Sequence, residues 1–181
     1  MGDTALATAL TGRMTQVCGA PNVITDPLEL RTYECDGLTS HRATPALVVL
    51  PATADEVAAV VRACAENNVP FVARGSGTGL SGGAVPHEEG VLIVMSRMRK
   101  ILEVDPVARR AVVEPGVTNL AVTEAVRGFG LFYAPDPSSQ VVCSVGGNVA
   151  ENSGGAHCLK HGFTATFPPT EQTTWLDGSG A

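Results

Sequence analysis

Apolar residues recur along this chain with helical spacing in some segments and in short continuous runs in others. In residues 4–17 they recur every three or four positions, which predicts a helix. Residues 46–51 form a short apolar run that is typical of a buried strand. Residues 54–67 return to helical spacing, with Thr53 as N-cap and Glu56 as its capping-box partner. The pattern therefore predicts that helices and strands alternate.

The apolar segment 69–74 predicts a second strand, parallel to strand 46–51 because a helix connects the two. Further along, the pattern predicts a strand over residues 91–96 and a hairpin whose two strands are 100–105 and 110–116. A helix is predicted over residues 118–130.

A glycine-rich segment directly follows the strand at 69–74. The sequence VPFVARGSGTGLSGGAVP (69–86) places five glycines between Gly75 and Gly83. Because glycine lets the backbone approach a ligand closely, successive N–H groups can converge on an anion. The segment therefore predicts a pyrophosphate cradle, with Arg74 and the loop hydroxyls as further donors. A flexible turn is the alternative.

The same segment contains a literal GxGxxG, from Gly77 to Gly82, and so raises a nicotinamide dinucleotide site as an alternative. That motif requires a helix after its last glycine. An acidic pair and the strand-like run VLIVMS follow instead, so no helix is expected. No Gly-Lys-Ser/Thr is present, which excludes a Walker loop.

A second loop system is predicted over residues 134–155, where four glycines and two prolines occur with little periodicity. Asn148 carries an amide that both donates and accepts, which suits the edge of a neutral ring. Hydrogen bonding of Asn148 within its own loop is an equal alternative. Asp136, between two prolines, is interpreted as a turn former rather than an acid catalyst.

Charge and cysteine content narrow the classes of function. The 181 residues include 12 Lys and Arg against 18 Asp and Glu, a net charge of −6, which argues against nucleic acid and anionic lipid as partners. Five cysteines without a CxxC pair suggest thiols in the cytoplasm, and no apolar run is long enough for membrane insertion. Docking to a membrane-bound partner at the inner membrane stays open.

Three stretches together carry a resemblance: YECDGLTSHRATPALVVLP, VPFVARGSGTGLSGGAVP and PDPSSQVVCSVGGNVAENSGG. They resemble the FAD-binding domain of the p-cresol methylhydroxylase (PCMH) or vanillyl-alcohol oxidase type, in particular glycolate oxidase FAD subunits and D-lactate dehydrogenases. The resemblance implies an α+β fold in two lobes, a small parallel β-α-β lobe near 46–74 and a mixed-sheet lobe from about 91 onward, incomplete at the C-terminus.

The resemblance also implies which residues contact FAD. The first loop would hold the pyrophosphate through Arg74, Gly75, Ser76, Gly77, Thr78, Gly79, Leu80 and Ser81. The second would lie along the cofactor toward the flavin through Pro135, Asp136, Pro137, Ser138, Ser139, Ser144, Gly146, Gly147 and Asn148. Some members of the resembled family bind the flavin covalently through a His in the first glycine loop. No His lies between Arg74 and Pro86 here, so the resemblance implies non-covalent FAD.

The resemblance divides the chain into a leading helix and lead-in segment (1–45), the N-terminal part of the PCMH-type domain (46–162) and a divergent tail (163–181). Pro168 and Pro169 oppose a central strand there, so the tail is expected to be disordered. The segment HCLKH (157–161) has a spacing that could suit a metal, but zinc would need two more ligands, so no metal is expected.

The implied function is FAD binding within an FAD-linked oxidoreductase that oxidises a 2-hydroxy acid of the glycolate or D-lactate type. Other subunits, a second flavin subunit and an iron–sulfur subunit, are the implied partners. The family's catalytic groups lie beyond the part that this chain resembles, so no catalytic residue is nominated. A truncated, catalytically inactive FAD-binding fragment is the alternative, and an NAD(P)-dependent dehydrogenase is a remote one.

Overall fold

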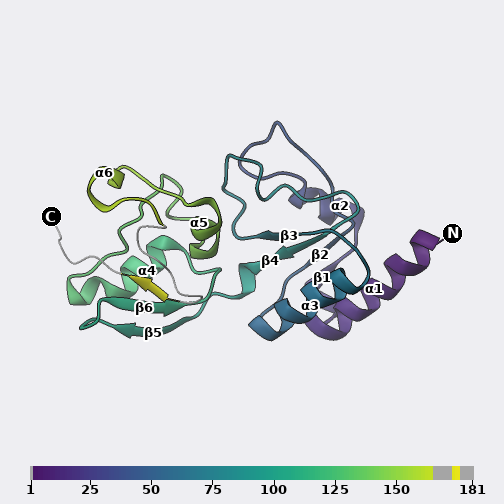
Figure 1. Cartoon of the computed structure of the whole chain (residues 1–181), viewed down its shortest axis with the longest axis horizontal. Coiled ribbons are helices and arrows are strands. Elements are labelled where there is room, and N and C mark those ends of the chain that lie inside the picture. The colour runs from purple at the N-terminus through teal and green to yellow at the C-terminus, as the bar shows by residue number, and fades with distance from the viewer. Residues whose placement is uncertain (1, 165–172, 176–181) are drawn as a thin grey trace. The chain divides into compact units, whose positions relative to one another are not determined.

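The computed structural model describes residues 2–164 and 173–175 and divides into two compact units, Met1–Arg97 and Met98–Ala181 (Figure 1). The first unit contains α1 (Gly2–Cys18), η1 (Ala20–Asn22), β1 (Val23–Ile24), α2 (Pro27–Leu30), η2 (Arg31–Tyr33), β2 (Leu47–Val49), α3 (Ala54–Glu66), β3 (Phe71–Arg74), β4 (Val91–Val94) and η3 (Met95–Arg97). The second contains β5 (Ile101–Asp105), β6 (Arg110–Val113), α4 (Asn119–Val126), η4 (Arg127–Phe129), α5 (Val145–Glu151), α6 (Cys158–His161) and β7 (Thr173–Trp175). The η elements are short 3-10 turns.

The first unit is built on a four-stranded sheet in the order β1-β2-β4-β3. Both β2 and β3 run parallel to β4, whereas β1 is antiparallel to β2. The predicted parallel strands are therefore confirmed, but β4 lies between them. The sequence analysis assigned this strand to the second lobe, and that assignment is wrong: β4 is the centre of the first sheet. All four of its residues are buried, as expected for a strand covered on both faces.

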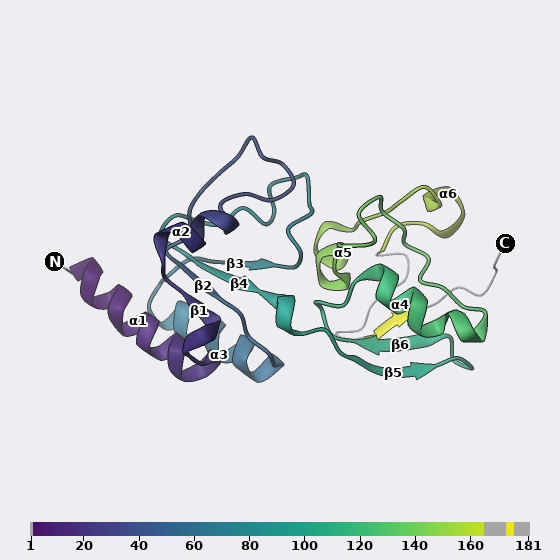
Figure 2. The same cartoon turned by 180° about the vertical axis from the view of Figure 1, so that it is seen from behind.

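Side chains of this sheet alternate between two cores. Leu47 and Ile93 pack with Met14 of α1 and Val60 of α3 on one face. On the other face Val48, Leu92 and Val94 pack with Leu30 of α2 and with Tyr33, which is partly buried. Figure 2 shows α1 and α3 on one side of the sheet and α2 on the other. Because α1 contributes to this core, the lead-in residues 1–45 are part of the first unit.

The predicted helix at 54–67 is confirmed as α3, and its capping explains where it begins. The Thr53 hydroxyl accepts a hydrogen bond from the backbone N–H of Glu56 (3.2 Å). The Glu56 carboxylate accepts one from the N–H of Ala52 (2.7 Å). Two N–H groups at the helix start are thereby satisfied.

The second unit contains a three-stranded antiparallel sheet in the order β5-β6-β7. The predicted hairpin is confirmed as β5 and β6, and the predicted helix as α4, whose Val122 and Val126 pack on Ala111 and Val113 of β6. Three elements of this unit were not predicted from the sequence. Helix α5 lies inside the segment interpreted as loop, α6 lies in the HCLKH segment, and β7 lies inside the expected disordered tail.

Strand β7 was not predicted because it forms by pairing with β6, which is distant in sequence. Such a long-range contact cannot be recognised from the local sequence. Thr173, Thr174 and Trp175 are residue types that favour strands, and they pair with Val112, Ala111 and Arg110 of β6. The remaining tail residues from 165 lie outside the described residues, Pro168 and Pro169 among them. The two α+β units themselves are as expected.

Replacement of Leu92 by Ala tests the first core. Leu92 is fully buried in the central strand, so Leu92→Ala is expected to lower the free energy of unfolding of this unit by about 2–5 kcal/mol. Chemical denaturation followed by circular dichroism measures the change. Leu28→Ala is the matched control, because Leu28 is 75% exposed and its loss should cost well under half as much. Equal losses would contradict the packing described above.

Candidate functional site

The glycine-rich loop follows β3 and leads to β4 with no helix in the described residues 75–90. The GxGxxG of this loop therefore lacks the helix N-terminus that a nicotinamide dinucleotide motif needs. Among the described residues, the backbone N–H groups from Ser76 to Leu80 donate to no protein acceptor. Five successive N–H groups thus have no acceptor among the described residues, and such a run of donors suits an anion.

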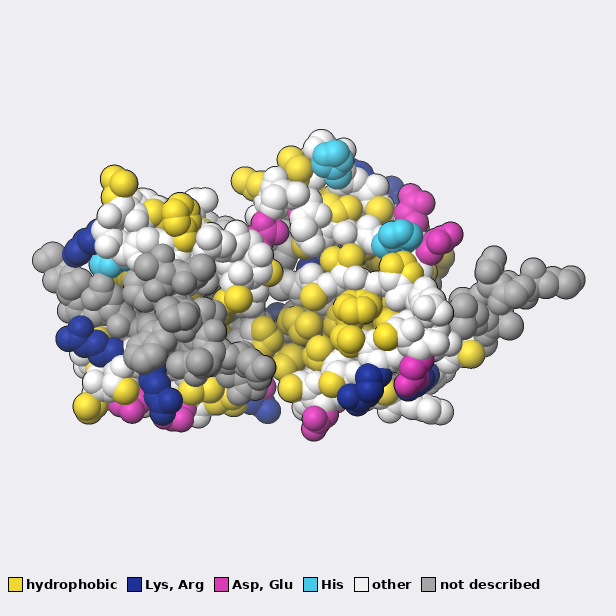
Figure 3. Space-filling view, viewed as in Figure 1, with side chains coloured by type: hydrophobic (Ala, Val, Ile, Leu, Met, Phe, Trp, Pro, Cys, Tyr) yellow, Lys and Arg dark blue, Asp and Glu magenta, His cyan; other side chains and the backbone are white. Residues whose placement is uncertain are grey.

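The loop also carries apolar surface. Leu80 is 72% exposed, and Phe71 at the start of β3 is 42% exposed. The right-hand part of Figure 3, which belongs to the first unit, shows hydrophobic side chains grouped on one face. The loop can therefore offer both polar donors and an apolar contact.

Arg74, the last residue of β3, fixes the base of the loop. Its Nη1 donates to the carbonyl oxygens of Cys35 (2.7 Å), Tyr33 (3.3 Å) and Ala84 (3.4 Å). The guanidinium carbon lies 5.9 Å from the centre of the Tyr33 ring. Desolvation by burial lowers the pKa of Arg74, partly offset by the nearby Cys35, Asp36 and Tyr33. These contacts join three chain segments at one side chain, and they occupy a nitrogen that the sequence analysis assigned to phosphate.

Two glycines allow these segments to approach. Gly77 has a φ of +70°, and a Cβ on it would collide with the Arg74 guanidinium. A Cβ on Gly37 would lie 2.8 Å from the carbonyl oxygen of Gly79 and 2.9 Å from that of Thr78. The segment around Gly37 therefore packs directly on the glycine loop. The sequence analysis treated this segment only as a lead-in, and its DG pair was the available signal.

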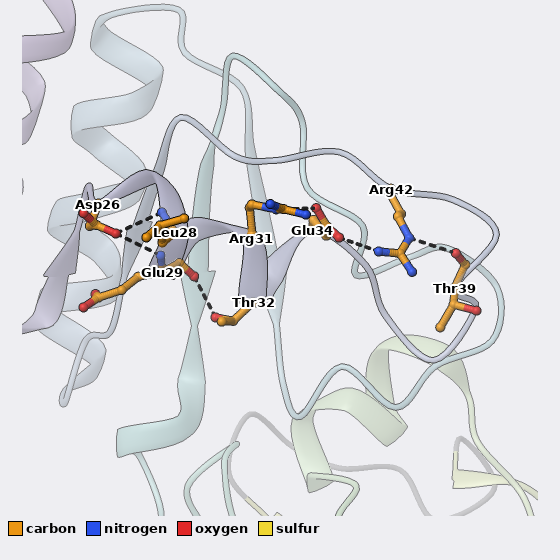
Figure 4. A network of polar contacts seen from close by, with 8 residues as sticks. All are labelled: Asp26, Leu28, Glu29, Arg31, Thr32, Glu34, Thr39 and Arg42. Atoms are coloured by element: carbon orange, nitrogen blue, oxygen red, sulfur yellow. Dashed lines mark hydrogen bonds and ion pairs between the residues drawn. The ribbon is translucent and has the colours of Figure 1, made fainter.

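The segment 34–43 is closed by polar contacts of its own (Figure 4). Arg42 Nη1 donates to the Glu34 carboxylate at 2.5 Å, and Arg42 Nε donates to the carbonyl oxygen of Thr39 at 3.3 Å. The N–H of Ala43 donates to the carbonyl oxygen of Glu34 (2.8 Å). These bonds bring the two ends of the segment together and support the part of it that contacts the glycine loop.

The second loop system differs because its backbone donors are largely used internally. Val145 N–H donates to the carbonyl oxygen of Val117 (2.8 Å), and Gly146 N–H to that of Pro115 (2.9 Å). The Ser144 hydroxyl caps α5 by accepting from Gly147 N–H (3.2 Å). The start of α5 is thus a shaped, internally satisfied surface, in contrast to the open donors of the first loop.

Asn148 lies in a buried amide pair. Its Nδ2 donates to Oδ1 of Asn119 at 2.5 Å, and Asn119 Nδ2 donates to the carbonyl oxygen of Pro135 at 3.0 Å. Both side chains are 1% exposed. The side chain of Asn148 therefore bonds to a residue of α4, outside its own loop. Asn119 was not singled out by the sequence analysis, and no local signal distinguishes it from an ordinary helix residue.

Tyr133 lies in the same buried region. Burial raises the pKa of Tyr133 to about 12, although hydrogen bonds with Thr164 and Asn148 act in the opposite direction. The Thr164 hydroxyl in turn donates to the carbonyl oxygen of Ser153 (2.6 Å). The polar side chains of this region are therefore held by one another.

Asp136 holds the later part of the second loop. Its Oδ2 contacts Nδ1 of His157, and its Oδ1 accepts from the His157 backbone N–H (3.3 Å). Cys158 Sγ accepts from the N–H of Gly155 (2.9 Å). Asp136 thus joins two segments, because it contacts a residue 21 positions further along the chain. Within the described ranges, no group of three His, Cys, Asp or Glu side chains is placed to hold a metal.

The remaining second-loop residues differ in exposure. Ser138 is exposed, whereas Pro137, Ser139, Gly146 and Gly147 are half-buried. Pro135 and Ser144 are buried. Only part of the predicted set can therefore reach a ligand with side-chain atoms.

The family model described as "FAD binding domain" matches residues 45–167. Glycolate oxidase subunit GlcD of Escherichia coli (strain K12) is 59% identical over 150 residues, which are 83% of this chain and 30% of that protein. D-lactate dehydrogenase of Archaeoglobus fulgidus is 37% identical over 149 residues, 82% of this chain and 33% of that protein.

A solved structure of p-cresol methylhydroxylase with substrate bound is similar with a TM-score of 0.73 and 21% identity, covering 82% of this chain and 30% of that one. This likeness shows that the fold is of the PCMH type. The chain spans about a third of the length of the curated relatives it matches. Of the helices in the part that the structure describes, none is long and apolar enough to cross a membrane.

Gly37→Ala tests the contact between the lead-in segment and the glycine loop. The new methyl group would press on two carbonyl oxygens, so the free energy of unfolding is expected to fall by about 1–3 kcal/mol. Gly12→Ala is the control: Gly12 lies within α1 with nothing within 4 Å of a Cβ, and the change should stabilise the helix by up to about 1 kcal/mol. Denaturation curves compare both. A neutral Gly37→Ala would contradict the close packing.

Tyr133→Phe tests the buried hydroxyl through pH. The unfolded tyrosine loses its proton near its ordinary pKa of 10.0, and the folded one near 12. Between these values the folded state binds more protons, so stability falls as pH rises, by up to about 3 kcal/mol. Tyr133→Phe should flatten this fall in unfolding free energy between pH 10 and 12.

Tyr33→Phe removes the only other tyrosine hydroxyl of the chain and serves as control. An equal slope for the wild-type protein and Tyr133→Phe would show that Tyr133 does not carry the dependence.

Proposed function

This chain belongs to the FAD binding domain family, and we propose on that premise that its two loops bind FAD in different ways. FAD is the cofactor of the family and of this domain. The first loop holds the pyrophosphate, and the second contacts the cofactor toward the flavin. Binding is non-covalent, because the first loop contains no His.

The open N–H groups from Ser76 to Leu80 carry the proposal. A pyrophosphate brings two negative charges to a protein whose own net charge is −6. Backbone donors compensate such an anion without a basic surface. In this proposal Ser76, Gly77, Thr78, Gly79 and Leu80 supply N–H groups, and the hydroxyls of Thr78 and Ser81 add donors. Gly75 connects the loop to β3, and Arg74 contributes by its charge and by fixing the loop base.

The second loop contributes shape and neutral contact. Pro137, Ser138, Ser139, Gly146 and Gly147 are at least partly exposed and would touch the cofactor. Pro135, Asp136, Ser144 and Asn148 would position them through the contacts described above. The internally satisfied backbone of this loop suits a neutral ring better than an anion, since few unpaired donors remain.

For the whole protein we propose oxidation of a 2-hydroxy acid of the glycolate or D-lactate type, supported by the names of the relatives. When bound, FAD would accept the hydride equivalent from the hydroxy acid. The residues of this chain bind and orient the cofactor, and none is assigned to proton transfer. Other subunits are proposed as partners in the cytoplasm, because one relative is itself named a subunit.

We also propose the functional division into a lead-in segment (1–45), an FAD-binding portion (46–162) and a tail (163–181). The family model matches residues 45–167, which supports the start of the second segment and extends beyond its end at 162. The compact unit boundary at Arg97 does not coincide with this division, because both units carry a loop assigned to FAD.

Titration of the full chain with FAD, followed by flavin fluorescence and visible absorption, tests the proposal. We expect one FAD per chain, released intact by heat. Added glycolate or D-lactate then separates the two functions: bleaching of the bound flavin supports an oxidoreductase, and binding without bleaching supports the inactive FAD-binding alternative. A chain that takes up no FAD would refute the proposed function.

Gly77→Ala tests the loop itself. Both Gly77 and Gly82 have positive φ values, +70° and +80°, but only a Cβ on Gly77 would displace the Arg74 guanidinium. We expect Gly77→Ala to weaken FAD binding about tenfold or more, which corresponds to about 1.4 kcal/mol. Gly82→Ala introduces a similar backbone strain, but its Cβ would not contact the Arg74 guanidinium. This variant should bind FAD nearly as the wild-type protein does. Equal weakening in both variants would assign the effect to backbone strain alone.

A further inference from the structure

The segment that packs on the glycine loop contains a buried carboxylate with one unused oxygen. Asp36 is 5% exposed. Its Oδ1 accepts a hydrogen bond from the N–H of Leu38 at 2.8 Å. Its Oδ2 is buried and has no hydrogen-bond partner among the described residues. No other side-chain nitrogen or oxygen in the described part of the chain is in this condition.

Both neighbours of Asp36 are fixed to the base of the glycine loop. The carbonyl oxygen of Cys35 accepts from Arg74 Nη1 at 2.7 Å, and Gly37 packs on the carbonyl groups of Thr78 and Gly79. The backbone of Asp36 therefore cannot move away without breaking these contacts. Asp36 therefore lies between two residues that contact Arg74 or the glycine loop.

No donor among the described residues makes a hydrogen bond to this oxygen. The charge of Asp36 acts on the Arg74 guanidinium, where it opposes the effect of desolvation, but no ion pair joins the two among the described residues. A buried acceptor without a donor is destabilising, and more so when it is charged. An unpartnered buried carboxylate of this kind lowers the stability of the protein. Its presence is explained if a ligand supplies the missing hydrogen-bond donor.

We propose that Oδ2 of Asp36 accepts a hydrogen bond from a sugar-type hydroxyl of FAD adjacent to its pyrophosphate. This inference rests on the proposed function. The phosphate oxygens of FAD are anionic acceptors at neutral pH and would repel a carboxylate, so they are not its partner. Hydroxyls occur on both sides of the pyrophosphate, on the ribityl chain and on the adenosine ribose, and a carboxylate is a strong acceptor for either.

Asp36→Asn in the full chain tests this assignment. The variant keeps the acceptor for Leu38 and the shape of the side chain, and it replaces the charged acceptor by an amide. We expect its Kd for FAD to rise about tenfold or more, as for loss of a hydrogen bond to a charged group. Calorimetric titration with ADP and with FMN identifies the hydroxyl: a loss with ADP indicates the ribose, and a loss with FMN indicates the ribityl chain.

Asp26→Asn is the matched control. Asp26 has a similar local geometry, with Oδ1 accepting from the N–H groups of Leu28 (2.9 Å) and Glu29 (3.1 Å), but at an exposed helix start. It changes the net charge by the same amount and should leave FAD binding unaltered. Equal weakening in both variants would assign the effect to net charge and overturn the proposal.

Thermal melting separates ligand binding from a purely structural role. Without FAD, Asp36→Asn should melt at the same temperature as the wild-type protein or higher, because an unpaired buried charge is gone. With saturating FAD its gain in melting temperature should be smaller. A lower melting temperature without FAD, a failure to fold, or an unchanged Kd would overturn the role of Asp36. Failure of the wild-type protein to bind FAD would instead refute the proposed function, before any variant is compared.

Discussion

The guanidinium of Arg74 on the backbone carbonyls of Tyr33, Cys35 and Ala84 is the interaction on which the first loop depends. These carbonyls come from segments far apart in the chain, and none of them lies in a strand that could satisfy it through a ladder. One nitrogen, Nη1, donates to all three, and the planar guanidinium also lies over the Tyr33 ring, a contact that suits arginine. The Arg74 contacts therefore give a loop of flexible residues a defined base.

A loop built in this way can leave its own N–H groups unused. Strands and helices consume their backbone donors, whereas the glycine loop is held by contacts at its base and by the approach of Gly37. The donors from Ser76 to Leu80 remain open for a ligand as a result. The same construction holds Asp36 beside the loop with one oxygen unsatisfied. In the proposed complex, the anionic pyrophosphate and a hydroxyl donor of the ligand would therefore both find partners in the first unit.

The second unit differs from the first because it uses its polar groups for bonds within the protein. Many of its polar side chains bond to one another, as in the buried pair of Asn148 and Asn119 and in the contact between half-buried Asp136 and exposed His157. A fully satisfied network is rigid, because each member is held by more than one partner. Such a region is suited to present a fixed surface to a neutral group, and it offers little to an anion. The two units therefore differ in chemistry as well as in fold.

The sequence by itself determined several of the local elements, though not the short helices α2, α5 and α6, and it indicated the nature of the ligand. Hydrophobic spacing predicted α1, α3, α4 and the hairpin, and the run of glycines indicated backbone donors for an anion, because both features depend on neighbours in sequence. It could not determine that β4 lies between β2 and β3, or that β7 pairs with β6, since strand order and pairing depend on contacts between distant segments. For the same reason only the tertiary structure decided that Arg74 is bound to backbone carbonyls, that Asn148 is buried against Asn119, and that Asp36 keeps an oxygen free beside the loop.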